Sequence, residues 1–129
     1  MTAVPKIRVL YLEDDEDSRE MVTFMLNLAG IEVASVTSSK DAARLAKSDV
    51  YDLYLLDGLL PTGDSLQLCR DLRAENPSTP IIFYSALGFQ SDIQKGLEAG
   101  ANDYLVKPYN GDLSEAVLRA VQEIGRAHV

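Results

Sequence analysis

The sequence lacks the features that mark secreted, membrane-bound or nucleic-acid-binding proteins. It has one cysteine, Cys69, which excludes an internal disulfide framework. The N-terminus has no basic region followed by a long apolar run, and no apolar stretch has the length of a membrane span. No run of lysine or arginine occurs, and the 20 acidic against 12 basic residues give a net charge of −8. We therefore expect a cytoplasmic protein that binds neither membranes nor nucleic acid directly and prefers cations and basic or mixed protein surfaces.

Apolar residues, by contrast, are sufficient for one buried core. The chain has 129 residues, of which 47% are hydrophobic, and we expect a single domain over residues 1–129 with its core over about 7–125. Short apolar runs alternate five times with stretches of helical period, which is typical of parallel strands joined by crossover helices. The predicted strands are Ile7–Leu12, Val33–Val36, Leu53–Leu56, Ile81–Tyr84 and Tyr104–Val106. The first, third and fourth are nearly continuous in apolar residues, which predicts central strands, and the other two are predicted at the edges.

Five helical segments lie between and after these strands. The first ends at Gly30, the second begins after Ser39 as its N-cap, and the third follows Asp64 and ends before Pro77. A weaker fourth ends near Gly100, and the last carries an apolar stripe made of Leu113, Val117, Ala120, Val121 and Ile124. Five such units predict an α/β fold, a three-layer doubly wound (βα)5 sandwich, which binds its ligands at the carboxyl ends of the strands.

Acidic residues gather where two of the predicted strands end. The first strand runs into five consecutive acids, residues 13–17, and the third ends at Asp57. Because the carboxyl ends of parallel strands share one edge of the sheet, we expect Asp14 and Asp57 to converge. Converging carboxylates repel each other and suit Mg²⁺, which accepts one or two carboxylates together with waters and a phosphate oxygen. Glu16 and Asp17 lie one step further on, and we expect them to stabilise the start of the next helix.

The fourth and fifth strands add a hydroxyl and an ammonium group to the same edge. Ser85 ends the fourth strand, and Lys107 ends the fifth. Pro108 follows the lysine, and a cis peptide bond between Lys107 and Pro108 would fix the direction of the lysine side chain. Together, these groups from four strand ends predict one site directed at a cation and a phosphoryl group.

In this order and context, the motifs resemble the receiver domains of two-component response regulators. The residues that carry the resemblance are Glu13-Asp14, Asp57, Leu60-Pro61, Ser85-Ala86 and Lys107-Pro108. The resemblance covers about residues 7–125, nearly the whole chain, and implies a flavodoxin-like sheet of five parallel strands in the order 2-1-3-4-5.

The resemblance also implies a role for each site residue. Asp57 would be the phosphoacceptor, while Asp14, Asp57 and the backbone carbonyl of Leu59 would bind Mg²⁺, or alternatively Mn²⁺, directly. Glu13 would act on the metal through a water molecule. The remaining roles concern the phosphoryl group: Ser85 would hydrogen-bond it, Lys107 would pair with it, and Tyr104 would be the aromatic side chain that turns inward on activation.

A protein of this kind is a signalling switch rather than a turnover enzyme. By the resemblance, Asp57 would receive its phosphoryl group from a histidine kinase, a phosphotransfer protein or a small phosphodonor. The surface formed by the fourth helix, fifth strand and fifth helix would then change and bind a downstream protein target.

Three positions depart from the common pattern of the family. Ser65 stands where glycine is frequent, and we expect it to alter the backbone path into the third helix without touching the chemistry. Leu59 and Leu87 flank the predicted phosphosite, and apolar side chains there orient an attacking water poorly. We therefore predict slow loss of the phosphoryl group from Asp57.

Three other readings compete with this one. A receiver-like binding module that works without phosphorylation would keep the acids. Here all five site positions are filled, namely Glu13, Asp14, Asp57, Ser85 and Lys107. An aspartyl-phosphate phosphatase generally has an acid two residues after its nucleophile, where this chain has Leu59. A flavin-binding electron carrier would have a phosphate loop rich in Gly, Ser or Thr in place of the acids after the first strand.

Overall fold

A computed structural model describes residues 6–125 of the chain. Strands and helices alternate along these residues in the order β1 (Arg8–Leu12), α1 (Glu16–Leu28), β2 (Glu32–Val36), α2 (Ser39–Ser48), β3 (Leu53–Leu56), α3 (Ser65–Glu75), β4 (Ile81–Ser85), α4 (Gln90–Glu98), β5 (Asp103–Val106) and α5 (Leu113–Glu123). Every predicted strand is present, within two residues of its expected ends. Among the described residues, no helix is long and apolar enough to cross a lipid bilayer.

The five strands form one parallel sheet in the order β2-β1-β3-β4-β5. This order confirms the predicted topology, with β2 and β5 at the edges. β1, β3 and β4 are central, and their residues are buried on both faces apart from the half-buried Arg8 and Tyr84. Because all strands run the same way, the residues that follow β1, β3, β4 and β5 lie at one edge of the sheet.

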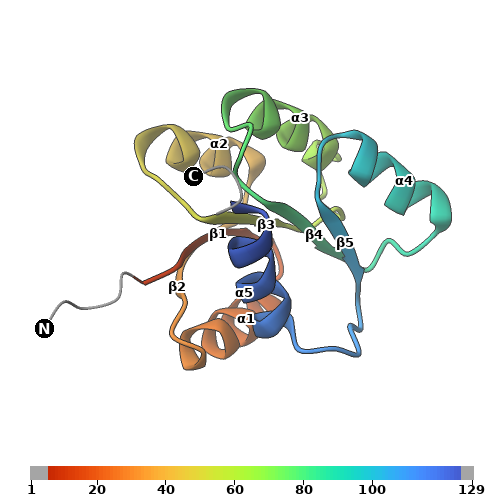
Figure 1. The fold of residues 1–129 in the computed structure, drawn as a ribbon. Coiled ribbons are helices and arrows are strands. Elements are labelled where there is room, and N and C mark those ends of the chain that lie inside the picture. The colour runs from red at the N-terminus through yellow and green to blue at the C-terminus, as the bar shows by residue number, and fades with distance from the viewer. Residues whose placement is uncertain (1–5, 126–129) are drawn as a thin grey trace, which may run out of the picture.

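Helices cover both faces of the sheet, as Figure 1 shows: α2, α3 and α4 on one face, and α1 and α5 on the other. Each face has its own apolar cluster, because alternate residues of a strand point to opposite sides. In β1, for example, Leu10 and Leu12 belong to the α2–α3 side, and Val9 and Tyr11 belong to the α1–α5 side. Cys69 of α3 is fully buried in the first cluster, and burial raises the pKa of its thiol to about 11, so it is an inert core residue.

The N-terminus of α2 differs from the prediction by one residue. Ser38, not Ser39, is the N-cap, and its hydroxyl accepts the N–H of Asp41. Ser39 lies in the first turn and instead donates a 2.6 Å hydrogen bond to Asp64 Oδ1 at the start of α3. The prediction missed this because the partner is distant in the sequence, whereas capping rules concern only neighbouring residues.

Candidate functional site

Carboxylates from two strands meet at the carboxyl edge of the sheet. Glu13 and Asp14 follow β1, and Asp57 follows β3. Each of the three offers a carboxylate oxygen, and these oxygens all lie within 4.8 Å of one another. Glu13 and Asp57 are buried, at 1% and 4% exposure, whereas Asp14 is exposed to solvent. The structure therefore brings together the acids that the sequence predicted would converge.

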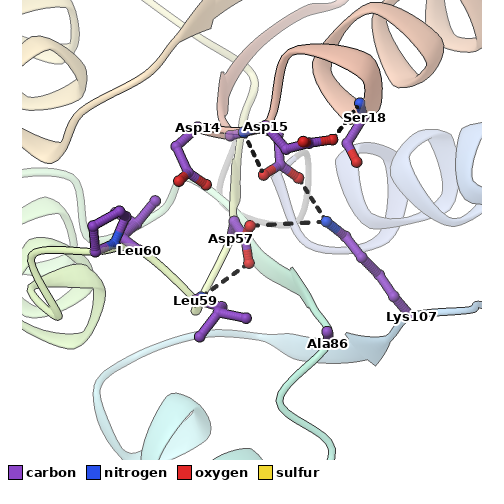
Figure 2. A pocket seen from close by; sticks show the side chains of 10 residues that line it. Asp14, Asp15, Ser18, Asp57, Leu59, Leu60, Ala86 and Lys107 are labelled. Carbon is purple, nitrogen blue, oxygen red and sulfur yellow. Dashed lines mark hydrogen bonds and ion pairs between the residues drawn. The ribbon is translucent and has the colours of Figure 1, made fainter.

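Lys107 reaches this cluster from the end of β5, as Figure 2 shows. Its ammonium Nζ lies 2.6 Å from Glu13 Oε1 and 3.8 Å from Asp57 Oδ2. The same Nζ lies 5.0 Å from the ring centre of Tyr84, within the range of a cation–π contact. The peptide bond between Lys107 and Pro108 is cis. Lys107 is thus directed into the site, but its direct partner is Glu13 rather than Asp57.

Both carboxylate oxygens of Glu13 accept hydrogen bonds. Oε1 accepts from Lys107 and, at 3.3 Å, from the hydroxyl of Tyr11, while Oε2 accepts the N–H of Asp15 at 3.2 Å. Burial would raise the pKa of Glu13, but its hydrogen bonds to Asp57 and Lys107 hold the pKa below its ordinary value. Burial, with the nearby charge of Glu13, raises the pKa of Tyr11, so its hydroxyl keeps its proton.

Asp57 is held from two directions by the segment that follows it. Its Oδ1 accepts the N–H of Leu59 at 3.0 Å, and its backbone carbonyl accepts the hydroxyl of Ser65 at 2.7 Å. Burial, followed by the neighbouring Glu13, raises the pKa of Asp57 to about 7, against the lowering effects of the Leu59 N–H and Lys107. Without a further cation, the buried cluster therefore favours a proton on Asp57.

The donor set of the cluster fits a hard divalent cation. Three carboxylates face one ammonium group, so negative charge is in excess, and burial together with the neighbouring Glu13 raises the pKa of Asp57. Oxygen ligands of this kind are those that Mg²⁺ and similar ions prefer. A bound cation would replace the proton and leave Asp57 ionised.

The acids open into a pocket of about 490 Å³ that also has an apolar wall. The wall consists of the consecutive residues Leu59, Leu60 and Pro61, and the rest of the lining is made of the acids, Ser18 at the start of α1, Ala86 and Lys107. Figure 2 shows Leu59 and Leu60 on the side of Asp57 that lies away from Lys107. Leu59 is 52% exposed, so this apolar wall is open to an incoming group.

Ser85 and Tyr104 are not among the residues that line the pocket. Ser85 is fully buried, and its hydroxyl accepts the N–H of Leu87 at 3.2 Å. The ring of Tyr104 stacks on Phe83 with centres 5.5 Å apart, and its hydroxyl donates a 2.6 Å bond to the carbonyl of Leu87. In this structure both side chains are engaged by the loop between β4 and α4.

Gly58 provides the space in which these hydroxyl groups meet. A Cβ atom at this position would lie 3.2 Å from Ser85 Oγ and 3.5 Å from the hydroxyl of Tyr104. Any side chain there would press on Ser85, so glycine next to Asp57 keeps the two hydroxyls close to the site.

Sequence reasoning missed three residues that support the site. Ser65 was expected to leave the chemistry alone, but its hydroxyl holds the backbone of Asp57. Tyr11 and Tyr84 were read only as strand residues, although they contact Glu13 and Lys107. For Tyr11 a signal existed: residues two apart on a strand share a face, which places Tyr11 beside Glu13.

Comparisons with known proteins agree with this geometry. The family model of the response regulator receiver domain matches residues 9–119. Among curated proteins, the transcriptional regulatory protein CseB of Streptomyces coelicolor is 38% identical over 113 residues, covering 88% of this chain and 48% of its own length. HprR of Escherichia coli, also a transcriptional regulatory protein, is 36% identical over 95% of this chain and 53% of its own length. The chain therefore spans about half the length of these relatives.

Solved structures show the same likeness in three dimensions. The receiver domain of the Francisella response regulator 1452 superposes with a TM-score of 0.81 at 28% identity, covering 96% of this chain and all of its own. A CheY-like receiver domain protein from Methanospirillum hungatei has a TM-score of 0.90 over 97% of this chain and 100% of its own; at 22% identity, this likeness shows the fold. With the fold, the acidic cluster and the family match in agreement, the chain belongs to the response regulator receiver domain family.

Proposed function

We propose that Asp57 accepts a phosphoryl group and that the chain acts as a phosphorylation switch in the cytoplasm. The observation that carries this proposal is the convergence of Glu13, Asp14 and Asp57 within 4.8 Å, with Lys107 Nζ 3.8 Å from Asp57. Acids alone would suit many cation sites. A half-buried lysine at the same point adds a partner for an anionic group, as phosphoryl transfer requires.

In the proposed reaction, a carboxylate oxygen of Asp57 attacks the phosphorus atom of the donor. The new bond joins that oxygen to phosphorus, while the bond from phosphorus to the leaving group breaks and its electron pair departs with that group. Asp57 must be ionised to attack. The N–H of Leu59 and Lys107 favour the ionised form, and the Ser65 hydroxyl holds the backbone in place.

Asp14 and Asp57, with the Leu59 carbonyl and with Glu13 acting through water, would hold Mg²⁺ or Mn²⁺, whose charge would polarise the phosphoryl oxygens. Lys107 supplies the protein's own positive charge to the same oxygens. For this it turns from Glu13 toward Asp57, where the transferring group arrives. Ser85, whose oxygen now accepts the N–H of Leu87, would donate its hydroxyl proton to a phosphoryl oxygen.

The donor would be a histidine kinase, a phosphotransfer protein or a small acyl phosphate, and the output would be a changed α4–β5–α5 surface. The bond from Tyr104 of β5 to the Leu87 carbonyl supports this route, because it ties β5 to the loop that holds Ser85. Movement of Ser85 toward the phosphoryl group would disturb that tie and alter the surface read by a protein target. We propose no direct contact with nucleic acid, since the net charge is −8.

Incubation with Mg²⁺ and acetyl phosphate, followed by intact-mass measurement, tests the proposal. Wild-type protein should gain the mass of one phosphoryl group, and Asp57→Ala should gain none. Asp52→Ala is the matched control, since Asp52 precedes the same strand but lies at its opposite end. No gain in wild type, or an equal gain in Asp57→Ala, would contradict the assignment and favour a module that works without phosphorylation.

A further inference from the structure

Two tyrosines of the sheet contact the ion pair between Glu13 and Lys107. The hydroxyl of Tyr11 in β1 donates to Glu13 Oε1 at 3.3 Å, the same oxygen that accepts Lys107 Nζ at 2.6 Å. In β4, the ring of Tyr84 faces that Nζ at 5.0 Å. The anionic partner is therefore contacted by a hydroxyl, and the cationic partner by an aromatic ring.

The proposed function requires Lys107 to leave its present partner. Its Nζ is 2.6 Å from Glu13 but 3.8 Å from Asp57, so pairing with a phosphoryl group on Asp57 draws the ammonium away from Glu13 Oε1. Glu13 is only 1% exposed. A buried carboxylate oxygen that loses its donor is costly unless another donor replaces it, because bulk water does not reach it freely. The metal-bound water of the proposed function can hydrogen-bond to the other oxygen, Oε2, so Oε1 still needs a donor from the protein.

Tyr11 is placed to be that replacement. It is fully buried beside Glu13, and its bond of 3.3 Å is longer than the roughly 2.5–2.7 Å usual for a hydroxyl on a carboxylate. The hydroxyl is therefore a secondary donor while Lys107 occupies Oε1, and it has room to approach when Lys107 turns away. The other oxygen, Oε2, accepts the Asp15 N–H and needs no replacement.

Tyr84 serves the cation in a complementary way. An aromatic face attracts an ammonium group without binding it in one direction, so the attraction persists while the group rotates. The side chain of Lys107 is 22% exposed, and the ring limits its escape to solvent.

We propose that Tyr11 and Tyr84 are positioning residues for phosphoryl transfer: Tyr11 takes over Glu13 Oε1 as Lys107 turns to the phosphoryl group, and the Tyr84 ring retains the ammonium during that turn. This inference rests on the proposed function of Asp57. It assigns different chemical groups to the two tyrosines, the hydroxyl in one and the ring in the other.

Substitutions can remove the hydroxyl of Tyr11 and the ring of Tyr84 one at a time. In Tyr11→Phe, the maximal rate of phosphorylation by acetyl phosphate should fall about three- to tenfold, the value of one hydrogen bond, with the half-saturating donor concentration unchanged. In Tyr84→Leu it should fall about two- to fivefold, and Tyr84→Phe should restore it. Tyr54→Phe, which alters a buried tyrosine of β3 on the other face of the sheet, is the control and should match wild type.

A second measurement distinguishes positioning from general loosening. Hydrogen exchange of the Lys107 ammonium group, followed by NMR on lysine-labelled protein without donor, reports how firmly Lys107 is held. In Tyr11→Phe the exchange should stay as slow as in wild type or become slower, because Lys107 then no longer shares Oε1 with a second donor. In Tyr84→Leu it should become faster. Faster exchange in Tyr11→Phe would mean that Tyr11 merely supports the fold, and would overturn its proposed role.

The two proposals fail in different ways. If wild-type protein gains no phosphoryl mass, the proposed function itself is wrong. If wild type is phosphorylated at Asp57 and Tyr11→Phe keeps the rate of Tyr54→Phe, only the role of Tyr11 is wrong. If Tyr84→Leu keeps the wild-type rate, the role of Tyr84 is wrong.

Discussion

Arg8 and Lys107 are both partly buried cations at strand ends, but they lie at opposite ends of the sheet. Arg8 starts β1 and pairs with Glu32 at 3.0 Å and Asp49 at 2.9 Å, with its guanidinium 4.9 Å from the ring centre of Tyr51. Lys107 follows β5 and pairs with Glu13 at 2.6 Å, near the ring of Tyr84. Each cation thus has acidic partners and a tyrosine ring.

The difference lies in the acids. The side chains of Glu32 and Asp49 are 56% and 49% exposed, whereas those of Glu13 and Asp57 are only 2% and 6% exposed. Hydrogen bonding to Arg8 lowers the pKa of Asp49, while burial raises the pKa of Asp57 to about 7. Solvent screens the charges around Arg8, but it screens the excess negative charge around the buried Asp57 much less. The same residue types therefore make a structural tie at one end and a ligand site at the other.

Removing Lys107 should have a far larger effect on phosphorylation than removing Arg8. Lys107→Met should lower the rate of phosphorylation by acetyl phosphate about 100- to 1000-fold, because it removes the protein's own positive charge from the developing phosphoryl charge. Arg8→Met should leave the rate per folded molecule unchanged. Intact-mass time courses on both variants measure this, and equal rates in Lys107→Met and wild type would show that the ion pair serves only the fold.

Stabilisation of the protein by a metal ion should depend only on the acids at the carboxyl edge of the sheet. Mg²⁺ binds the folded cluster and relieves its repulsion, so a concentration of about 100 times Kd should add about 2.7 kcal/mol to the free energy of unfolding. Thermal unfolding with and without Mg²⁺ measures the change. Asp14→Ala should lose most of it and Asp52→Ala should keep it; a response that survives in Asp14→Ala would place the cation elsewhere.

The pH dependence of stability should have opposite signs at the two ends. Asp57 has a pKa of about 7 when folded against 3.8 as its ordinary value, so the folded state takes up the proton first. Without metal, the contribution of Asp57 is most favourable below about pH 4 and is lost as the pH rises through 7, on the order of 2 kcal/mol because solvent at the pocket mouth screens part of the repulsion.

Asp49 should behave in the reverse way. Its folded pKa lies below the ordinary value, so its contribution is present above that value and is lost as the pH falls. Urea unfolding in EDTA at pH 5 and pH 8 tests the Asp57 end, and a further measurement at about pH 3 tests the loss of the Asp49 contribution. Asp57→Asn should be more stable than wild type at pH 8 and should weaken the fall between the two pH values, whereas Asp49→Asn should be less stable than wild type at pH 8. A wild-type protein that gains stability between pH 5 and pH 8, with no such gain in Asp57→Asn, would contradict the raised pKa.

Sequence patterns predicted the site at the carboxyl edge of the sheet well, because a parallel sheet brings the residues that follow its strands to one edge. Once β1, β3, β4 and β5 are known to be parallel, the residues after them must share one edge, so Asp14, Asp57 and Lys107 could be placed together without coordinates. The apolar runs also fixed which strands are central, since only strands covered on both faces lack polar alternation.

Pairings within that edge could not be predicted, because they depend on distances of a few ångströms between distant residues. The preference of Lys107 for Glu13 joins residues 94 positions apart. The bond from Ser39 to Asp64 spans 25 positions and depends on how α2 meets α3. The hydroxyl of Ser65 finds the Asp57 carbonyl only because the loop after β3 folds back. Local patterns carry no information on such contacts.

The smallest expected effect concerns the rate at which the phosphoryl group is lost from Asp57. This rate should depend on the apolar wall of the pocket. Leu59 is 52% exposed beside Asp57, and its side chain has no polar atom with which to orient a water molecule for attack on phosphorus. Leu59→Asn supplies an amide at that position and should speed release several-fold, by a change in barrier of about 1 kcal/mol.

The matched control for this last prediction lies at the opposite end of the sheet. Val50 is 79% exposed near Arg8, so Val50→Asn adds the same amide far from the pocket and should leave release unchanged. Phosphate release from pre-phosphorylated protein measures both variants against wild type. Release from wild type within seconds would mean that water is already oriented by another group, and that the apolar wall serves to contact the donor rather than to protect the product.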